Sequence, residues 1–193
     1  MLFRSYQYDR SEDMRLTSFS MAKTLIALLV GLALQDGLIR SLDEMAQHYA
    51  SSLAGSAYGE TPIRHLLSMS SGVKFREDYD GNDDSARLSQ ATFGGRSAGG
   101  AAAVRQFNER ISLPGRQWYY ASAETVVLAL VARAAYGRPL AEVFEERIWR
   151  MIGAEASSSW LVDRSGLEIG FMGFGATLRD YARLGLMLAD RGK

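Results

Sequence analysis

Residues 18–30 read SFSMAKTLIALLV, a polar start that runs directly into an apolar stretch. Ser20 and Lys23 stand three residues apart, so on a helix they lie on the same face, one turn from each other. A lysine ammonium held among apolar side chains loses hydration, which favours the neutral amine that can act as a base. Unpaired N–H groups at a helix N-terminus also favour a nearby oxyanion. The stretch therefore indicates a Ser-x-x-Lys acyl-transfer site at the start of a buried helix.

The pattern alone does not decide the chemistry, because it occurs twice. Ser71 and Lys74 repeat the spacing, but Gly72 lies between them and no apolar helix follows, so we assign no chemistry to this second copy. The alternative for Ser20 is an ordinary helix N-cap, with Lys23 extending to solvent. This segment by itself leaves both interpretations open.

Composition and charge exclude several classes of function. The chain has 193 residues, 47% of them hydrophobic and 23% charged, as in an ordinary soluble globular protein. Its 22 basic and 22 acidic residues balance, and no basic stripe with interleaved aromatics stands out, so nucleic acid is not an expected partner. Cysteine is absent, which excludes disulfides and thiol catalysis.

No metal, cofactor or membrane span is expected either. The two histidines, His48 and His65, lack ligand spacing, and we interpret His65 as structural rather than catalytic. The longest apolar run, residues 24–34, is too short to span a bilayer and reads as a core helix. We therefore assign a cytoplasmic location, although any export signal would precede the present start. The oligomeric state stays open.

Capping signals and periodicity predict a mainly α fold with few strands. A capping box at Ser41 is expected to open a helix, and residues 78–89 read as a surface loop with a short helix. The other predicted helices cover residues 20–35, 61–72, 99–110, 122–136, 139–152 and 177–190. Strands are expected only at residues 2–8 and 159–162. Since so few strands are not stable alone, we expect a partial domain over residues 1–193, with partner strands beyond both ends.

A second group of polar residues precedes the predicted helix at 122–136. Tyr120 and Ser122 lie on the same side of an extended turn. A tyrosine beside a lysine cation has its phenolate favoured, so Tyr120 could share a proton with Ser20. The alternatives are a core aromatic for Tyr120 and a helix N-cap for Ser122, and the cap is favoured.

Several segments together resemble the serine β-lactamase-like hydrolases, a superfamily that holds class C β-lactamases, DD-peptidases, family VIII esterases and 6-aminohexanoate-dimer (nylon oligomer) hydrolases. The resemblance rests, in order and spacing, on residues 20–23, 64–72, 77–79, 114–122, 160–164 and 173–185. The last two segments are most similar to the nylon oligomer hydrolases. The implied fold is a helical part packed against an antiparallel sheet, of which this chain carries mainly the helical part.

The resemblance also implies roles for individual residues. Ser20 would be the acylated nucleophile, Lys23 its general base and Tyr120 the partner that passes the proton to the leaving group. Tyr79 matches a tyrosine that reaches the substrate amide, and Ser122 would be a second substrate contact. The implied function is hydrolysis of a small amide or ester through an acyl-enzyme, without a cofactor.

Two departures from the superfamily pattern keep alternatives open. Ser122 stands where β-lactamases and DD-peptidases usually carry asparagine, and the Lys-Thr-Gly-like strand that supplies one oxyanion-hole N–H is absent before Lys193. Loss of one such donor costs on the order of 10²–10³ in turnover. The alternatives are a penicillin-binding DD-peptidase or β-lactamase, and a truncated, non-catalytic relative that acts only as a binding fragment.

Overall fold

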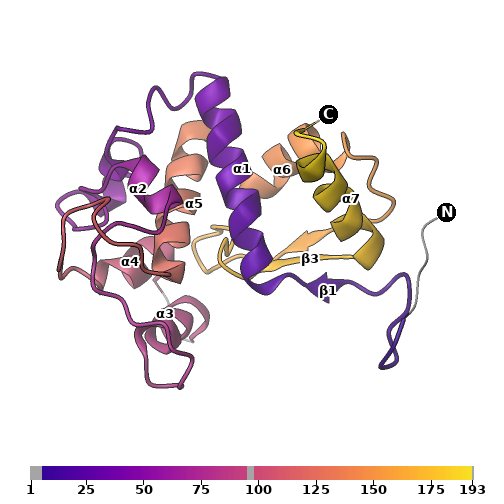
Figure 1. Ribbon diagram of the computed structural model, residues 1–193, viewed down its shortest axis with the longest axis horizontal. Coiled ribbons are helices and arrows are strands. Elements are labelled where there is room, and N and C mark those ends of the chain that lie inside the picture. Colours follow the sequence, from indigo (N-terminus) through magenta and orange to yellow (C-terminus); the bar gives the residue numbers. More distant parts are fainter. Residues whose placement is uncertain (1–5, 95–97, 193) are drawn as a thin grey trace.

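Two long helices form the centre of the molecule. The computed structural model describes residues 6–94 and 98–192. Helix α1 (Ala22–Gln35) packs along α5 (Ser122–Tyr136), and both are apolar on most of their surface, so each is largely buried. Ile26 and Leu29 of α1 and Val127 of α5 are fully inaccessible to solvent. This pair connects the two sides of the molecule (Figure 1).

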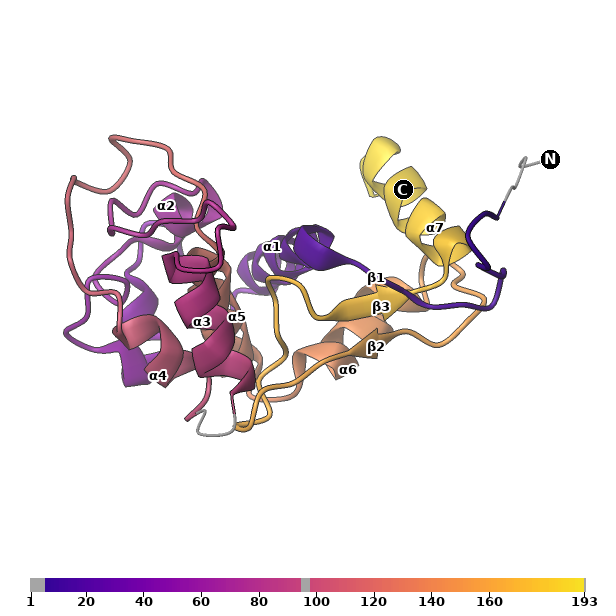
Figure 2. The ribbon, with the colours of Figure 1, turned by 90° about the horizontal axis from the view of Figure 1, so that it is seen from below.

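Shorter elements surround this central pair. The remaining helices are α2 (Ile63–Leu67), α3 (Asp84–Phe93), α4 (Gly100–Arg105), α6 (Leu140–Phe144) and α7 (Leu178–Ala189). The short helical turns are the 3₁₀ turns η1 (Phe19–Met21), η2 (Ala46–His48) and η3 (Ser51–Leu53) and the π-helical turn η4 (Glu145–Trp149). Figure 2 shows α2, α3 and α4 on one side of α1, with α6, α7 and the strands on the other.

A small antiparallel sheet lies beside α6 and α7. Its strands are β1 (Leu16–Thr17), β2 (Ser159–Trp160) and β3 (Phe174–Ala176), in the order β1-β3-β2. The register pairs Trp160 with Phe174, and the Phe174 ring also contacts Phe144, Trp149 and Tyr181 at centroid distances of 5.3, 5.6 and 6.0 Å. These edge-on aromatic contacts fix the strands against α6, η4 and α7.

The mainly α character and several predicted boundaries are confirmed. Thr177 caps α7, because its side chain accepts a hydrogen bond from the Asp180 amide. The predicted helix at 122–136 has the observed bounds of α5, and the one at 139–152 is α6 continued by η4. Among the described residues, no helix combines the length and the apolar character needed to cross a bilayer.

The helix predicted from the capping box at Ser41 is wrong. The Ser41 hydroxyl accepts from the Asp43 amide at 3.1 Å, which closes a tight turn instead of capping a helix. The Glu44 carboxylate, which would complete the box, pairs with Arg40 at 2.6 Å and accepts from the Tyr49 hydroxyl. The reciprocal hydrogen bonds of a capping box therefore do not form, and only the turns η2 and η3 follow.

Two other helices are shorter than predicted. The helix predicted over 61–72 ends at Leu67, and Thr61 does not cap it, because its hydroxyl donates to the Ala57 carbonyl at 2.8 Å. Gly72, expected to end this helix, instead lies against a neighbouring segment: a Cβ there would come within 2.1 Å of the Ser112 carbonyl oxygen. The helix predicted over 99–110 covers only Gly100–Arg105.

The strand predicted at residues 2–8 lies mostly outside the described residues. Within the described part, residues 6–8 are not a strand. Strand β1 at Leu16–Thr17 occupies the sheet edge next to β3 and leads directly to Ser20. The second predicted strand is confirmed at Ser159–Trp160.

Candidate active site

Ser20 lies where the sheet ends and the central helix begins. It is part of η1, immediately before α1, and its side chain is exposed. The segment is anchored by the Ser18 amide, which donates to the Phe174 carbonyl of β3 at 2.8 Å. Phe19 has a φ of +45°, a conformation that residues with side chains rarely adopt. The sharp change of direction at Phe19 presents Ser20 at the N-terminus of α1.

The Lys23 side chain ends beside Ser20. The Nζ atom donates to Ser20 Oγ at 3.0 Å and to the main-chain carbonyl of Phe171 at 3.1 Å. Phe171 lies in the loop between β2 and β3 and is buried, and Lys23 is half-buried. The two contacts hold the amine in place beside the serine oxygen.

Tyr120 completes the group from a distant part of the chain. Its hydroxyl donates to Ser20 Oγ at 2.8 Å, across 100 residues of sequence. Lys23 Nζ also lies 4.9 Å from the centroid of the Tyr120 ring, within cation–π range. Because Tyr120 stands just before α5, the packing of α5 on α1 determines this meeting. The structure thus brings together the three residues predicted to carry the chemistry.

Glu77 links the two other predicted site residues. Its carboxylate accepts from the Tyr79 hydroxyl at 2.8 Å, and from the hydroxyl and the amide of Ser122, both at 2.6 Å. Ser122 is the first residue of α5 and Ala121 takes the N-cap position without a side-chain cap, so the favoured N-cap interpretation of Ser122 is wrong. The Glu77 carboxylate instead accepts from the Ser122 amide at the start of the helix, where a negative charge is favourable.

Tyr79 stands on a strained and exposed loop. Its φ is +58° and its side chain is 70% exposed. Desolvation by neighbouring atoms and the hydrogen bond to the Glu77 carboxylate raise the pKa of the Tyr79 phenol. The neutral hydroxyl is therefore the form present at neutral pH, able to donate one hydrogen bond.

Asp83 holds the loop that carries Tyr79. Its carboxylate accepts from the amides of Asp78, Tyr79 and Ala86 at 2.7, 2.6 and 2.8 Å, and it forms the N-cap of α3. Burial opposes ionisation of Asp83, but these hydrogen bonds and one from the Ser85 hydroxyl outweigh it and lower the pKa to about 2. The carboxylate is therefore charged near neutral pH and keeps its hydrogen bonds to the loop amides of Asp78 and Tyr79.

A cavity of about 350 Å³ opens beside Ser20. Its lining combines polar and apolar groups, among them Ser20, Glu77, Tyr79, Ser122, Phe171 and Met172. The predicted nucleophile and both predicted substrate contacts therefore face one space. The volume is within the range of small-molecule sites.

The histidines are not part of this group. The His65 ring packs against Gly115, whose φ is +81° and where a Cβ would lie 2.5 Å from the imidazole Cε1. Over residues 6–94 and 98–192, no cluster of three His, Asp or Glu side chains is placed to hold a metal ion. The side chains around Ser20 are those of nucleophilic and acid–base chemistry.

Sequence analysis missed two contributors to the site. Glu77 stands two residues before Tyr79, but no sequence pattern links it to Ser122. Its role is visible only from its hydrogen bonds with both residues in the fold. The Phe171 contribution comes from a main-chain carbonyl, which no side-chain pattern could have revealed.

Comparison with protein families identifies the fold. The model of the beta-lactamase family matches residues 2–192. The chain belongs to this family. The resemblance inferred from the Ser20, Tyr79 and Tyr120 segments is thereby confirmed.

Individual relatives are consistent with this assignment. The chain is 26% identical, over 196 residues, to a 6-aminohexanoate-dimer hydrolase of Paenarthrobacter ureafaciens, with all of this chain and 50% of that protein covered. A Bacillus anthracis protein, provisionally described as a 6-aminohexanoate-dimer hydrolase, has a similar structure (TM-score 0.88, 24% identity, 99% of this chain and 52% of that one). A D-stereospecific amidohydrolase from Streptomyces sp. shares the fold (TM-score 0.69, 20% identity, 93% and 62% covered).

The extent of the match is as informative as its strength. This beta-lactamase-family chain spans about half the length of the curated relative and of the Bacillus anthracis protein. Its described part carries a sheet of three strands and the helices α1 to α7. The relatives are named as hydrolases, which supports a hydrolase as the class of this chain.

Proposed function

We propose that this chain carries the nucleophilic centre of a serine hydrolase that cleaves a small amide or ester through an acyl-enzyme on Ser20. One observation carries the proposal: Ser20 Oγ lies within hydrogen-bond distance of both Lys23 Nζ, at 3.0 Å, and the Tyr120 hydroxyl, at 2.8 Å. A serine is a weak nucleophile unless a base stands within such reach.

The reaction follows from these contacts. Ser20 Oγ attacks the carbonyl carbon, and its proton passes to the Lys23–Tyr120 pair, in which either the Lys23 amine or the Tyr120 phenolate is unprotonated and accepts it. The pair then returns the proton to the leaving amine or alkoxide as the carbon–nitrogen or carbon–oxygen bond breaks. Water repeats the sequence on the acyl-enzyme, with the pair again accepting and returning a proton. The N-terminus of α1 supplies partial positive charge near the oxyanion.

Tyr79 is proposed as a substrate contact in this cavity, and Ser122, predicted as a second contact, is proposed to act through Glu77. The neutral Tyr79 hydroxyl can exchange its hydrogen bond with Glu77 for one with a substrate amide, since the side chain is exposed. Ser122 is almost fully buried and donates to Glu77, so its part is to orient that carboxylate at the cavity wall. Glu77 then connects substrate binding to the start of α5.

The test is intact mass after incubation with a fluorophosphonate probe. The parent chain should gain one adduct, and Ser20→Ala should gain none. Ser18→Ala is the matched control, because Ser18 lies on the same segment but donates to the Phe19 carbonyl and not to the Lys23–Tyr120 pair. It should label at the parent rate.

The other outcomes separate the alternatives. A folded parent that gains no adduct would contradict the proposal for this chain and favour a non-catalytic relative. A stable adduct with a penicillin, formed faster than turnover of short amides or esters, would favour the DD-peptidase or β-lactamase alternative. Retention of labelling in Ser20→Ala would refute the assignment of the nucleophile.

A further inference from the structure

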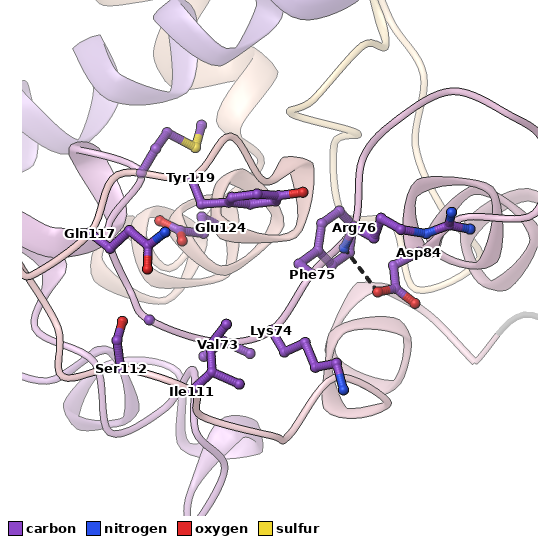
Figure 3. A pocket seen from close by; sticks show the side chains of 12 residues that line it. Val73, Lys74, Phe75, Arg76, Asp84, Ile111, Ser112, Gln117, Tyr119 and Glu124 are labelled. Carbon is purple, nitrogen blue, oxygen red and sulfur yellow. Dashed lines mark hydrogen bonds between the residues drawn. The ribbon is translucent and has the colours of Figure 1, made fainter.

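A second cavity, of about 330 Å³, shares no lining residue with the cavity beside Ser20. It lies between the segment that follows α2 and the loop that leads to α5. Figure 3 shows the Tyr119 ring on one side of this space and Val73 and Ile111 on the opposite side. Phe75 and Val73 are buried, whereas Tyr119 and Ile111 are 43% and 62% exposed. The cavity therefore has a closed apolar floor and an open apolar rim, in the size range of small-molecule sites.

Main-chain hydrogen bonds hold the two sides of this cavity together. The Gly72 carbonyl accepts from the amides of Ile111 and Ser112 at 2.8 and 3.3 Å. The Met69 carbonyl accepts from the Tyr119 amide at 2.8 Å. The two segments also approach closely, since a Cβ on Gly72 would lie 2.1 Å from the Ser112 carbonyl oxygen. The space is thus formed by the fold itself, as ligand cavities usually are.

The two cationic side chains of the lining already have partners. Lys74 Nζ lies 2.8 Å from a Glu109 carboxylate oxygen. The Arg76 guanidinium lies 2.9 Å from a carboxylate oxygen of Asp80. A negatively charged ligand would therefore have to compete with a carboxylate for either cation.

The two carboxylates of the lining are paired as well. Asp84 accepts from the Arg76 amide at 2.9 Å, which the dashed line in Figure 3 marks, and lies 2.7 Å from Arg87. Glu124 is only 2% exposed and accepts from the Ser71 hydroxyl at 2.6 Å, on the protein side. A charged ligand would lose hydration here without an unpaired counter-charge to replace it. The charges of the lining therefore favour a neutral ligand.

Two neutral polar side chains of the lining are available instead. In the described part of the chain, neither the Gln117 amide nor the Ser112 hydroxyl has a hydrogen-bond partner. Gln117 is exposed, and Figure 3 shows both side chains reaching into the cavity from the loop that leads to α5. A glutamine amide presents a carbonyl acceptor and an N–H donor side by side. A ligand with the same two groups on one edge matches it.

We propose that this cavity binds a neutral, flat aromatic amide, whose ring packs between Tyr119 and Ile111 and whose carboxamide pairs with the Gln117 side chain. Two amide groups pair edge to edge, each donating one N–H and accepting at one carbonyl. The Ser112 hydroxyl can serve the remaining N–H or the second lone pair of the ligand carbonyl. Offset stacking on the Tyr119 ring favours a flat ring over a branched body. This site is independent of the chemistry proposed at Ser20.

The experiment is a methyl NMR titration of the full chain with benzamide as the probe. The methyl signals of Val73 and Ile111 should shift and saturate, because both side chains line the cavity. N,N-Dimethylbenzamide has the same ring but no N–H, so it should bind about tenfold more weakly. Benzoate, which has the same ring with a negative charge, should also bind about tenfold more weakly.

The variant Gln117→Glu tests the amide contact with a change of sign. It replaces the N–H donor by a charged acceptor at an exposed position, so the fold should be kept. Benzamide should bind about tenfold more weakly than to the parent. Benzamidine, a cation that only donates, should bind about tenfold more tightly than to the parent, because its hydrogen bonds become charge-assisted. Gln35→Glu adds the same charge at the exposed end of α1 and should bind both probes like the parent.

A second variant leaves Gln117 intact. Ile111 is 62% exposed, so Ile111→Trp should fold normally while filling the cavity from its open rim. Binding of benzamide should be lost in this variant.

Several results would overturn the proposal. These are no saturable shift in the parent, equal affinity for benzamide in Gln117→Glu, or N,N-dimethylbenzamide or benzoate binding as tightly as benzamide. Unchanged binding in Ile111→Trp would do the same. Shifts centred on Met172, which lines the cavity beside Ser20, would place the amide at the other site and also overturn it.

Discussion

Two regions of the molecule contain the same Ser-x-x-Lys spacing, and only one of them forms the contact that the pattern suggests. Lys23 donates to Ser20, and Tyr120 reaches the same oxygen. Ser71 instead donates to Glu124, while Lys74 pairs with Glu109. The spacing is thus compatible with either arrangement, and the surrounding helix decides between them.

The difference has a physical cause. Ser20 and Lys23 lie on the continuous turns of η1 and α1, so a separation of three residues places them on one face. Ser71 lies beyond the end of α2, and Gly72 has a φ of +74°, so the chain turns away between serine and lysine. Ser71 is also 1% exposed, out of reach of a substrate. The predictions below test this comparison by changing matched residues in the two regions.

The largest effect is expected for the two serines. Ser20→Ala should lower ester or amide hydrolysis by at least about 10³-fold, because the attacking oxygen is removed. Ser71→Ala should leave the rate within about twofold, although it should lower stability because Glu124 loses the hydroxyl donor and the Val73 amide loses its acceptor. Hydrolysis rates and urea unfolding of both variants check this. An equal loss of activity in Ser20→Ala and Ser71→Ala would contradict the claim that only the first serine is the nucleophile.

The two lysines should differ almost as much. Lys23→Ala should lower hydrolysis by about 10²–10⁴-fold, the usual contribution of a positioned base. Lys74→Ala removes only an exposed ion pair with Glu109 and should change neither rate nor stability measurably. The measurement is the rate of acyl-enzyme formation by quenched-flow mass spectrometry. A Lys23→Ala protein that acylates at the parent rate would remove Lys23 from the mechanism.

The adjacent tyrosines give a finer comparison. Tyr120→Phe keeps the ring beside Lys23 but removes the hydroxyl that reaches Ser20, so hydrolysis should fall by about 10²-fold. Tyr119→Phe should have no effect on the rate, since Tyr119 lines the other cavity. Steady-state kinetics of both variants distinguish the two tyrosines. A similar loss in both would indicate a general disturbance of the segment before α5.

The smallest effect is a dependence of stability on pH at Glu124. Its pKa in the folded chain, about 7, lies above its ordinary value of 4.5. The folded state therefore binds the extra proton, and stability from this group is present below about pH 4.5 and lost as the pH rises through 7. Relative to the parent, Glu124→Gln should gain up to roughly 3 kcal/mol between pH 5 and pH 8.

Urea unfolding of the parent and Glu124→Gln at both pH values checks this prediction. Glu142→Gln is the matched control, and its difference from the parent should not change with pH, because the side chain is exposed. A constant difference for Glu124→Gln as well would mean that Glu124 is not held in an environment that favours its neutral form.

The sequence predicted what depends on local periodicity and missed what depends on tertiary contacts. Helices α1 and α5 and the cap at Thr177 follow from apolar spacing and end signals that act over a few residues. The helix predicted to end at Gly72 ends at Leu67, and Gly72 instead lies against Ser112, a contact between distant segments. The capping box at Ser41 failed for a local reason, because Glu44 pairs with Arg40, four residues earlier.

The same division applies to the site. Ser20 and Lys23 were predictable because they share a helix, and Tyr120 was identified through resemblance. Their meeting depends on the packing of α5 on α1, which only the structure shows. Glu77 joins two segments that are far apart in sequence, so its contacts with Ser122 could not be predicted.

The most direct test of the central claim is to locate the adduct after labelling with a fluorophosphonate. Trypsin should release Ser20 in the peptide of residues 16–23 and Ser71 in the peptide of residues 65–74, because Arg15, Lys23, Arg64 and Lys74 bound them. The account predicts that the adduct lies on Ser20 in the first peptide and that the second is unmodified. An adduct on Ser71, or on neither peptide of a labelled chain, would contradict it.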